Sequence, residues 1–243
     1  MEILALILVV LLPTGDHFFM ERDYFNAITE YKRALFRGDA DSSIILRKIA
    51  LSYLEQQKYD YSMKYYSEYL YNYDAEVSRL YAVALIRSGL YDDAIYLLSG
   101  TEDLCGLELI AIAHGFAGRY DSSFAILDSL NIAHPDYVDD EKALLFSRIL
   151  PGFGLVFIGE VPLFLGTLAI TGACGYLTYR YVRRGLYFEA LTTGFPLFQR
   201  FYRGGLSNMK LKYRIYYENT LKRILSELES SLIEREEARL FDF

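Results

Sequence analysis

The stretch that most constrains the fold of this 243-residue chain is an uncharged run at residues 161–179. At the α-helical rise of about 1.5 Å per residue it reaches about 28 Å, close to the thickness of a bilayer's hydrocarbon core. Glu160 precedes the run and segment 180–184, with three arginines, follows it, so charges lie where headgroups would be. A membrane-spanning helix is the simplest interpretation, and a buried helical pair of a soluble domain is the alternative.

A second, shorter apolar run at residues 185–199 predicts a return helix. It contains Glu189 and is surrounded by aromatic residues, which are typical of membrane interfaces. On the first helix, one face of small residues would let a neighbour approach closely; it comprises Thr167, Thr171, Gly175 and Thr178. We therefore expect a membrane hairpin within residues 137–205.

The hairpin is preceded by a glycine-rich turn made of Pro151, Gly152, Gly154 and Gly159. Glycine permits positive φ and close backbone approach, and Pro151 would end a helix that arrives over residues 142–150. We interpret this turn as a bend at the membrane surface. A phosphate-binding loop is the competing interpretation, but no strand pattern precedes the turn and no Gly-Lys-Ser/Thr follows it.

The N-terminal segment, residues 1–15, carries an apolar run at residues 3–12. This run is too short to cross a bilayer but has the length of a secretory signal core, so we expect a signal peptide and export. A retained anchor and a buried repeat helix remain alternatives, because Glu2 opposes the terminal amine and the segment 13–15 is a mediocre cleavage site.

Residues 16–136 contain an internal repeat of amphipathic helices, with no stretch of strand-like alternation. Four segments align, each with an aromatic Tyr followed three residues later by a small side chain: 22–27, 57–62, 89–94 and 118–123. The small residues Ala27, Ser62, Ala94 and Ser123 are 35, 32 and 29 residues apart. This spacing fits a helix-turn-helix unit with a period of about 34 residues.

The repeat resembles the tetratricopeptide repeat (TPR). Small side chains at Ala50, Ala82 and Ala111 on the first helix of a unit, and at the positions above on the second, would let the helices pack. The Pro-Gly-x-Gly turn resembles that of bacterial membrane proteins of unassigned activity, in which a two-helix hairpin often follows such repeats; Leu155 and Phe157 depart from their pattern. The resemblance implies an all-α fold: a TPR-like solenoid, a transmembrane hairpin and a C-terminal helix.

Solenoids of this type bind partners in a groove lined by the first helix of each unit. The resemblance places a partner-binding groove at Arg47, Leu51, Leu54, Arg79, Val83, Ile86, Glu108 and Ile112. The Asn-like clamp positions of chaperone-binding members hold Leu51, Val83 and Ile112, so that function is not implied. Packing against the next helix is an equally good explanation for any one of these apolar residues.

Two further surfaces follow from composition. Tyrosines crowd residues 59–73, and Tyr61 and Tyr65 are the best candidates for an exposed interaction face. Residues 206–243 predict one long amphipathic helix with a stripe at steps of three and four. The stripe comprises Leu206, Met209, Tyr213, Tyr217, Leu221, Ile224, Leu228 and Leu232. We favour packing of this stripe within the chain over a coiled coil or an interfacial helix.

Charge and motifs exclude several function classes. The net charge of −7 argues against nucleic acid as a partner. Two distant cysteines and three scattered histidines indicate neither a disulfide framework nor a metal site, and no catalytic motif occurs. We therefore expect no cofactor and no enzymatic activity.

The sequence favours a membrane-anchored scaffold of the bacterial cell envelope that binds a protein or peptide, with the repeats on the exported, periplasmic side. The alternative is a membrane-embedded assembly or transport subunit that forms homo-oligomers through its hairpin. The arginines on both sides of the hairpin leave its orientation open.

Overall fold

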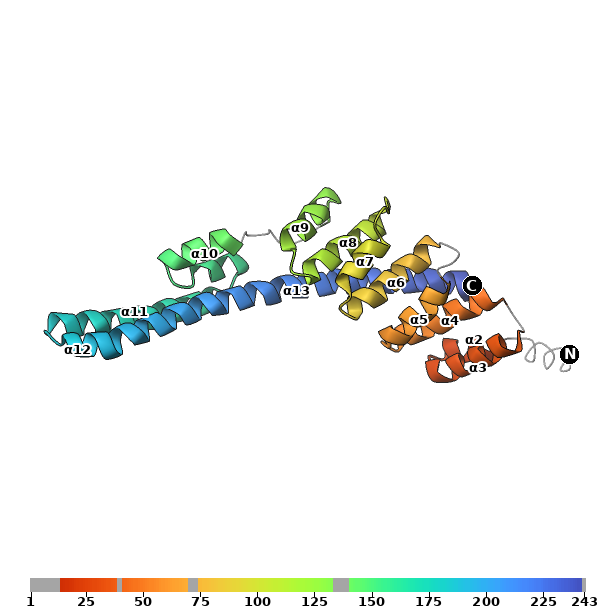
Figure 1. Cartoon of the computed structure of the whole chain (residues 1–243), viewed down its shortest axis with the longest axis horizontal. Coiled ribbons are helices and arrows are strands. Elements are labelled where there is room, and N and C mark those ends of the chain that lie inside the picture. Colours follow the sequence, from red (N-terminus) through yellow and green to blue (C-terminus); the bar gives the residue numbers. More distant parts are fainter. Residues whose placement is uncertain (1–13, 39–40, 70–73, 133–139, 242–243) are drawn as a thin grey trace. The chain divides into compact units, whose positions relative to one another are not determined.

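The computed structural model describes residues 14–38, 41–69, 74–132 and 140–241 (Figure 1). Over these residues the chain forms helices joined by turns and no strands, which confirms the all-α expectation. The chain divides into two compact units, one made of Met1–Ala133 with Leu221–Phe243 and the other of His134–Thr220. Residues 1–13 of the expected signal peptide lie outside the described residues.

The first unit is built from successive helices that follow one another through short turns (Figure 1). The helices are α2 (Thr14–Met20), α3 (Tyr24–Arg37), α4 (Ser42–Glu55), α5 (Tyr59–Tyr69), α6 (Ala75–Arg87), α7 (Tyr91–Leu97), α8 (Leu104–Phe116) and α9 (Tyr120–Ser129). Asp23, Asp41, Asp74 and Asp103 cap α3, α4, α6 and α8, each accepting a hydrogen bond from a backbone N–H of the first turn.

The same turn geometry recurs between the helices of each pair. The residue two positions before the repeat tyrosine is left-handed every time: Arg22 (φ 59°), Gln57 (φ 57°), Gly89 (φ 83°) and Gly118 (φ 80°). The next residue then donates its N–H back to the helix, as Leu90 does to the Leu85 carbonyl at 2.9 Å. Such a left-handed residue ends a helix and reverses the chain, so the repeat in the sequence is also a repeat of backbone conformation.

Small side chains lie where the paired helices touch. Every one of the small repeat positions is completely buried: Ala27, Ala50, Ser62, Ala82, Ala94, Ala111 and Ser123. The Ser62 hydroxyl donates to the Ala50 carbonyl at 3.0 Å, which ties α5 directly to the α4 backbone. The helices therefore approach more closely than larger side chains would allow.

The C-terminal half of α13 (Phe195–Phe241) completes the first unit. Leu221, Leu225 and Leu232 are buried in this unit, and a side chain built at Gly115 of α8 would come within 2.3 Å of Leu221. The apolar stripe of residues 206–240 thus packs within the chain over its C-terminal half. The helix itself begins earlier than predicted, at Phe195.

The second unit comprises α10 (Asp140–Ile149), the 3₁₀ helix η2 (Phe153–Ile158), α11 (Val161–Arg183), α12 (Tyr187–Glu189), the π-helical turn η3 (Ala190–Gly194) and α13 up to Thr220. α11 and the first half of α13 run antiparallel (Figure 1). They are in register, with Lys212 paired to Glu160, Gly205 beside Thr167 and Gly194 beside Thr178.

Among the described residues, α11 is the one helix long and apolar enough to cross a membrane by length and composition. Only 6% of the most apolar 18-residue stretch of α11 is buried within the structure. The helix α13 beside it carries Arg200, Arg203 and Lys210 over the same length and does not meet that test. The two antiparallel helices therefore differ in polarity.

Candidate functional site

The predicted groove residues lie on α4, α6 and α8, and the apolar ones among them are covered. Leu51, Leu54, Val83, Ile86 and Ile112 are at most 3% exposed. Leu51 belongs to a core cluster against which Ile233 and Leu240 of α13 pack. This face of the repeats therefore holds the chain's own C-terminal helix.

The strongest polar contact on this face joins Arg47 of α4 to Glu236 of α13. The Arg47 Nε and Nη2 atoms donate to the two Glu236 carboxylate oxygens at 2.8 and 2.7 Å. Arg47 is 9% exposed and Glu236 1%. Burial opposes the charge of Arg47, but the bond and charge of Glu236 outweigh it and raise the arginine's pKa. A bidentate pair in this setting recognises a carboxylate at one defined position.

Within the part of the chain that the structure describes, three further ion pairs join α13 to the repeats. Arg87 of α6 donates to Glu229, and Arg239 donates to Asp74 at 3.1 Å and also to Glu76. Burial opposes ionisation of Asp74, but the hydrogen bonds from Arg239 and the Glu76 backbone N–H, with the nearby arginine charges, lower its pKa. Glutamates of α13 thus pair with arginines of the repeats, and Arg239 of α13 pairs with carboxylates of the repeats.

Arg79, the second cation predicted for the groove, bonds within the repeats. Its Nη2 lies 3.0 Å from a carboxylate oxygen of Asp103 at the start of α8, while its buried Nε has no hydrogen-bond partner. Glu108, on the same helix, is half-buried, and burial raises its pKa. Arg79 therefore links α6 to α8, and among the described residues neither Arg79 nor Glu108 forms an ion pair with α13.

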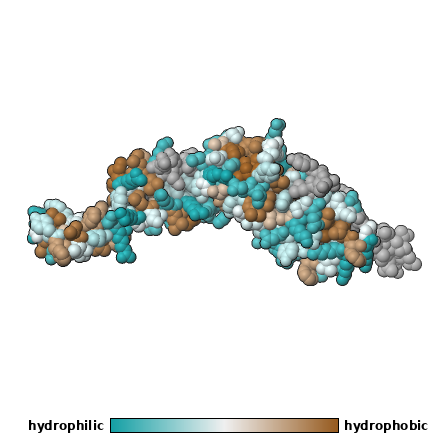
Figure 2. Space-filling model, viewed as in Figure 1, coloured by the Kyte–Doolittle hydropathy of each residue, from teal (hydrophilic) through white to brown (hydrophobic). Residues whose placement is uncertain are grey.

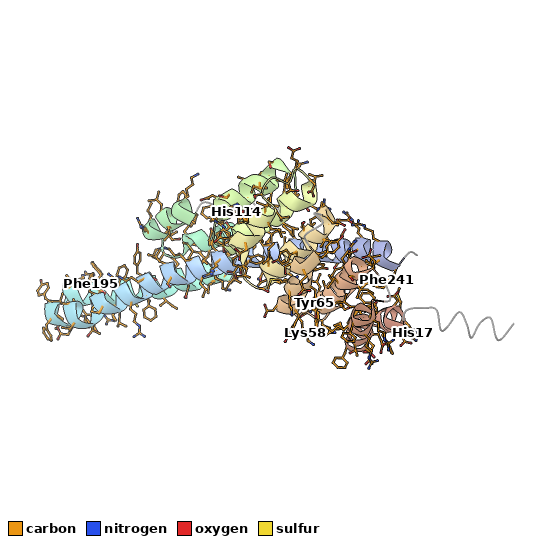
Figure 3. All side chains as sticks on the ribbon, turned by 45° about the vertical axis from the view of Figure 1, so that its right-hand side comes forward. His17, Lys58, Tyr65, His114, Phe195 and Phe241 are labelled. Atoms are coloured by element: carbon orange, nitrogen blue, oxygen red, sulfur yellow. The ribbon has the colours of Figure 1, made fainter. Side chains whose placement is uncertain are left out.

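An aromatic contact secures the end of α13. The Phe241 ring stacks on Phe19 at 4.7 Å between centroids, and the Lys48 ammonium lies 4.6 Å from the same ring. Lys48 is in turn paired with Asp16 at 2.8 Å. Figure 3 shows Phe241 at the end of α13, against the α2–α3 pair.

The tyrosine surface is smaller than the sequence suggested. Tyr61 is 57% exposed, whereas Tyr65 is half-buried. Both rings stack on Tyr53, at 5.2 and 5.6 Å, and the Lys32 ammonium lies over Tyr53 and Tyr65. Tyr61 is therefore the exposed ring of an ordered aromatic stack. Tyr65, the half-buried member of this stack, is labelled in Figure 3.

The Pro-Gly-x-Gly turn is a packed element. Pro151 follows α10, and Gly152 (φ 82°) and Gly159 (φ 77°) flank η2 in left-handed conformations that favour glycine. Gly154 is buried, its N–H donates to the Ser147 hydroxyl at 2.8 Å, and its carbonyl accepts from the Tyr213 hydroxyl at 2.7 Å. The turn therefore fixes α10 and η2 to α13.

The described residues bring together no group of three or more His, Cys, Asp or Glu side chains that could hold a metal ion. His114 is half-buried on α8, and burial, helped by the charge of Arg119, lowers its pKa. Cys105 and Cys174 are free thiols on different units. Among the described residues, the repeats hold one amphipathic helix with acidic side chains, the chain's own α13.

Sequence reasoning missed the residues of α13 that make these contacts. Glu229 and Glu236 are seven residues apart, and Leu225 and Leu232 share that spacing. Acids on the same side of a helix as a buried leucine stripe were a signal of internal pairing.

In comparisons with known proteins, no protein-family model matches the chain and no curated protein is significantly similar to it.

Proposed function

We propose that this chain is a non-enzymatic, membrane-anchored repeat scaffold of the bacterial cell envelope. In this proposal TPR-like repeats on the exported side bind a protein or peptide, and α11 holds the chain in the bilayer. The observation that carries it is the α13 segment 221–241 seated on the predicted groove residues through the Arg47–Glu236 pair.

The seated helix indicates the chemistry of the partner. A ligand for this face would be an amphipathic helix with a leucine stripe and two carboxylates seven residues apart, as in Leu225, Leu232, Glu229 and Glu236. Such a partner would compete with the internal helix for Arg47. Because only the fraction of chains with an open face can bind, the internal helix would set the apparent affinity.

A labelled synthetic peptide of residues 221–241 tests this face on the full chain in detergent micelles. Glu236→Gln weakens the internal helix and leaves Arg47 available, so it should bind the peptide at least about tenfold more tightly than the unmodified chain. Arg47→Ala also loosens the internal helix but removes the carboxylate's partner. It should bind the peptide more weakly than Glu236→Gln does.

A peptide with glutamine at the positions of Glu229 and Glu236 is the matched control and should bind less tightly to every variant. If fluorescence anisotropy detects no peptide binding to Glu236→Gln, the segment 221–241 is a permanent part of the fold. The groove would then not be the partner site, and Tyr61 would become the better candidate.

Support for the anchor comes from the composition and exposure of α11. Exposed apolar side chains occur along the helix, including Leu165, Ile170 and Val182. Exposed residues Leu145, Phe146 and Ile149 add an apolar patch on α10, which is brown in Figure 2. Large apolar surfaces of this kind are typical of membrane or protein contact.

Membrane retention after alkaline extraction tests the anchor. Ala169→Arg introduces a charge at an exposed site of α11, which is costly in the hydrocarbon region and should release part of the protein. Ala125→Arg, at an exposed site of α9, is the control and should be retained like the unmodified chain. Complete release of the unmodified protein would rule out the anchor.

A second candidate function, a homo-oligomeric membrane assembly, is favoured by the charges of α13. Arg200, Arg203, Lys210 and Arg214 follow at steps of three, seven and four, so they form one row. Gly205, Met209 and Tyr213, on the opposite side of the helix, are buried. Several hairpins could keep such rows in water at the centre of an assembly rather than in lipid. Detergent-resistant oligomers of the full chain would support this alternative.

A further inference from the structure

A groove runs along one flank of the hairpin between α11 and α13. Its volume is about 500 Å³, and its lining includes Gly166, Thr167 and Thr171 of α11 and Arg200, Gly204 and Asn208 of α13. A Cβ atom built at Gly166 or Gly204 would meet nothing within 4 Å. Both glycines line the groove, so a larger side chain at either position has room to extend over it.

One buried polar group in the groove has no partner. Thr171 is 3% exposed, and its hydroxyl makes no hydrogen bond to any residue that the structure describes. The flanking threonines of α11 behave differently, since Thr167 donates to the Leu163 carbonyl and Thr178 to the Cys174 carbonyl, both at 2.9 Å. A hydroxyl that leaves this usual bond unmade is available to a ligand in the groove.

The rim of the groove carries a cation. Arg200 is exposed, and no carboxylate of the described residues lies within ion-pair distance of it. It begins the row of Arg200, Arg203, Lys210 and Arg214 on α13. Arginine presents paired donors that match the geometry of a phosphate. The groove thus combines an apolar floor, a free hydroxyl and a phosphate-binding rim.

We propose that this groove is a binding site for one anionic phospholipid. An acyl chain lies over Gly166 and Gly204, the phosphate meets Arg200, and the Thr171 hydroxyl donates to an ester oxygen. This inference rests on the proposed membrane anchoring. The register of the two helices places Arg200 beside the middle of α11. If the hairpin stood upright in the membrane, Arg200 would be exposed to lipid tails. The proposal therefore also implies that α13 lies at headgroup level and α11 lies deeper.

Charge argues for a lipid over a second copy of the chain. Two hairpins side by side and parallel in a membrane would bring Arg200 and Arg203 of both copies to the same level. Like charges at short range repel each other, so this arrangement of two copies is unfavourable. An anionic headgroup would neutralise the same arginines, and the acyl chain of the lipid would contact the groove at Gly166 and Gly204.

Native mass spectrometry of the detergent-solubilised full chain, titrated with phosphatidylglycerol or with phosphatidylcholine of identical chains, tests the proposal. The unmodified protein should retain one phosphatidylglycerol at least about tenfold more tightly than phosphatidylcholine. Gly204→Leu and Gly166→Leu, which fill the groove, should abolish this binding. Gly172→Leu is the matched control, because Gly172 is equally open but does not line the groove.

Two polar variants test the individual contacts. Arg200→Gln should remove the preference for phosphatidylglycerol, whereas Arg180→Gln, an exposed arginine outside the groove, should keep it. Thr171→Val keeps the shape and should weaken binding several-fold. Inorganic phosphate in large excess should not displace the lipid, since the acyl chain supplies part of the affinity.

Three results would overturn the lipid site. They are equal retention of the two lipids, binding unaffected by Gly204→Leu and Gly166→Leu, and a lipid-free dimer that these variants dissociate, which would make the groove an interface between copies. Flotation of the protein with vesicles distinguishes loss of the lipid site from loss of membrane anchoring. A variant that floats but no longer prefers phosphatidylglycerol has lost only the lipid site. Failure of the unmodified chain to float would instead contradict the anchor.

Discussion

Arg47 and Glu236 form a buried, bidentate ion pair across 189 positions of the sequence. The pair joins α4 to α13 and lies on the face that was predicted to bind a partner. A buried pair of this kind gives little net stability over apolar residues, but it is costly to break on one side. It therefore sets the register of α13 on the repeats more than it adds to their stability.

Glu236→Gln should lower the free energy of unfolding of the first unit by about 3 kcal/mol, because the buried Arg47 guanidinium loses its bidentate partner and keeps, among the described residues, only the Asp74 carboxylate, 3.8 Å away, as a counter-charge. Urea unfolding of the full chain in mild detergent, followed by circular dichroism, measures the change. Glu234→Gln, at an exposed site two residues away, should change stability by less than about 0.5 kcal/mol.

The double replacement Arg47→Met with Glu236→Leu should recover most of the loss, because it removes both buried charges together. A double variant as unstable as Glu236→Gln would show that the loss comes from packing rather than from an unpaired charge.

Stability should fall in acid through Asp74. Its pKa is lowered in the folded state, so its stabilising effect is present above the unfolded pKa of about 3.9 and is lost as the pH falls through the lower folded value. Asp74→Asn keeps a capping side chain but removes the charge. It should cost about 1 kcal/mol at pH 7 and flatten the decline of stability below about pH 4.

Asp60→Asn controls for the general effect of removing a carboxyl, since Asp60 is exposed on α5 and has no cationic partner among the described residues. An acid unfolding curve that is the same for Asp74→Asn and the unmodified chain would contradict the assignment.

Two buried tyrosines should respond in opposite ways to loss of the hydroxyl. The Tyr66 hydroxyl is buried without a hydrogen-bond partner, so Tyr66→Phe should stabilise the protein by up to about 1 kcal/mol. The Tyr31 hydroxyl donates to Asp16 at 2.8 Å, so Tyr31→Phe should destabilise it by about 1–2 kcal/mol. Thermal unfolding of both variants checks the contrast, and destabilisation by Tyr66→Phe would contradict it.

The helical repeat was predictable because its determinants are local. Small residues such as Ala94 and Ser123 recur near the helix-turn-helix period, and the left-handed turn residue stands at a fixed distance before them. The start of α13 was not predictable in this way. The helix was expected over residues 206–243, but it begins at Phe195 and runs through Gly204 and Gly205, where Gly205 packs closely against Thr167.

The candidate site was predictable only in part, for a related reason. The positions that face inward from α4, α6 and α8 follow from the repeat, so Leu51 and Val83 lie on the expected helices. What covers them depends on a contact such as Arg47–Glu236, which joins distant parts of the chain. No local pattern specifies such a pair. The unbonded Thr171 hydroxyl likewise depends on a rotamer, and the sequence does not fix it.

Gly115 of α8 should tolerate no side chain beneath α13 without loss of stability. An added methyl group would come within 2.3 Å of the Leu221 side chain and 2.9 Å of the Ser123 hydroxyl, so Gly115→Ala should destabilise the first unit by about 1–3 kcal/mol. Leu221→Ala alone should cost about 2–5 kcal/mol through the cavity it leaves. The added methyl group fits into that cavity, so the double variant should lose less than the two single changes together, with a coupling of about 1 kcal/mol in denaturant unfolding. Strict additivity would mean that α13 does not rest on Gly115.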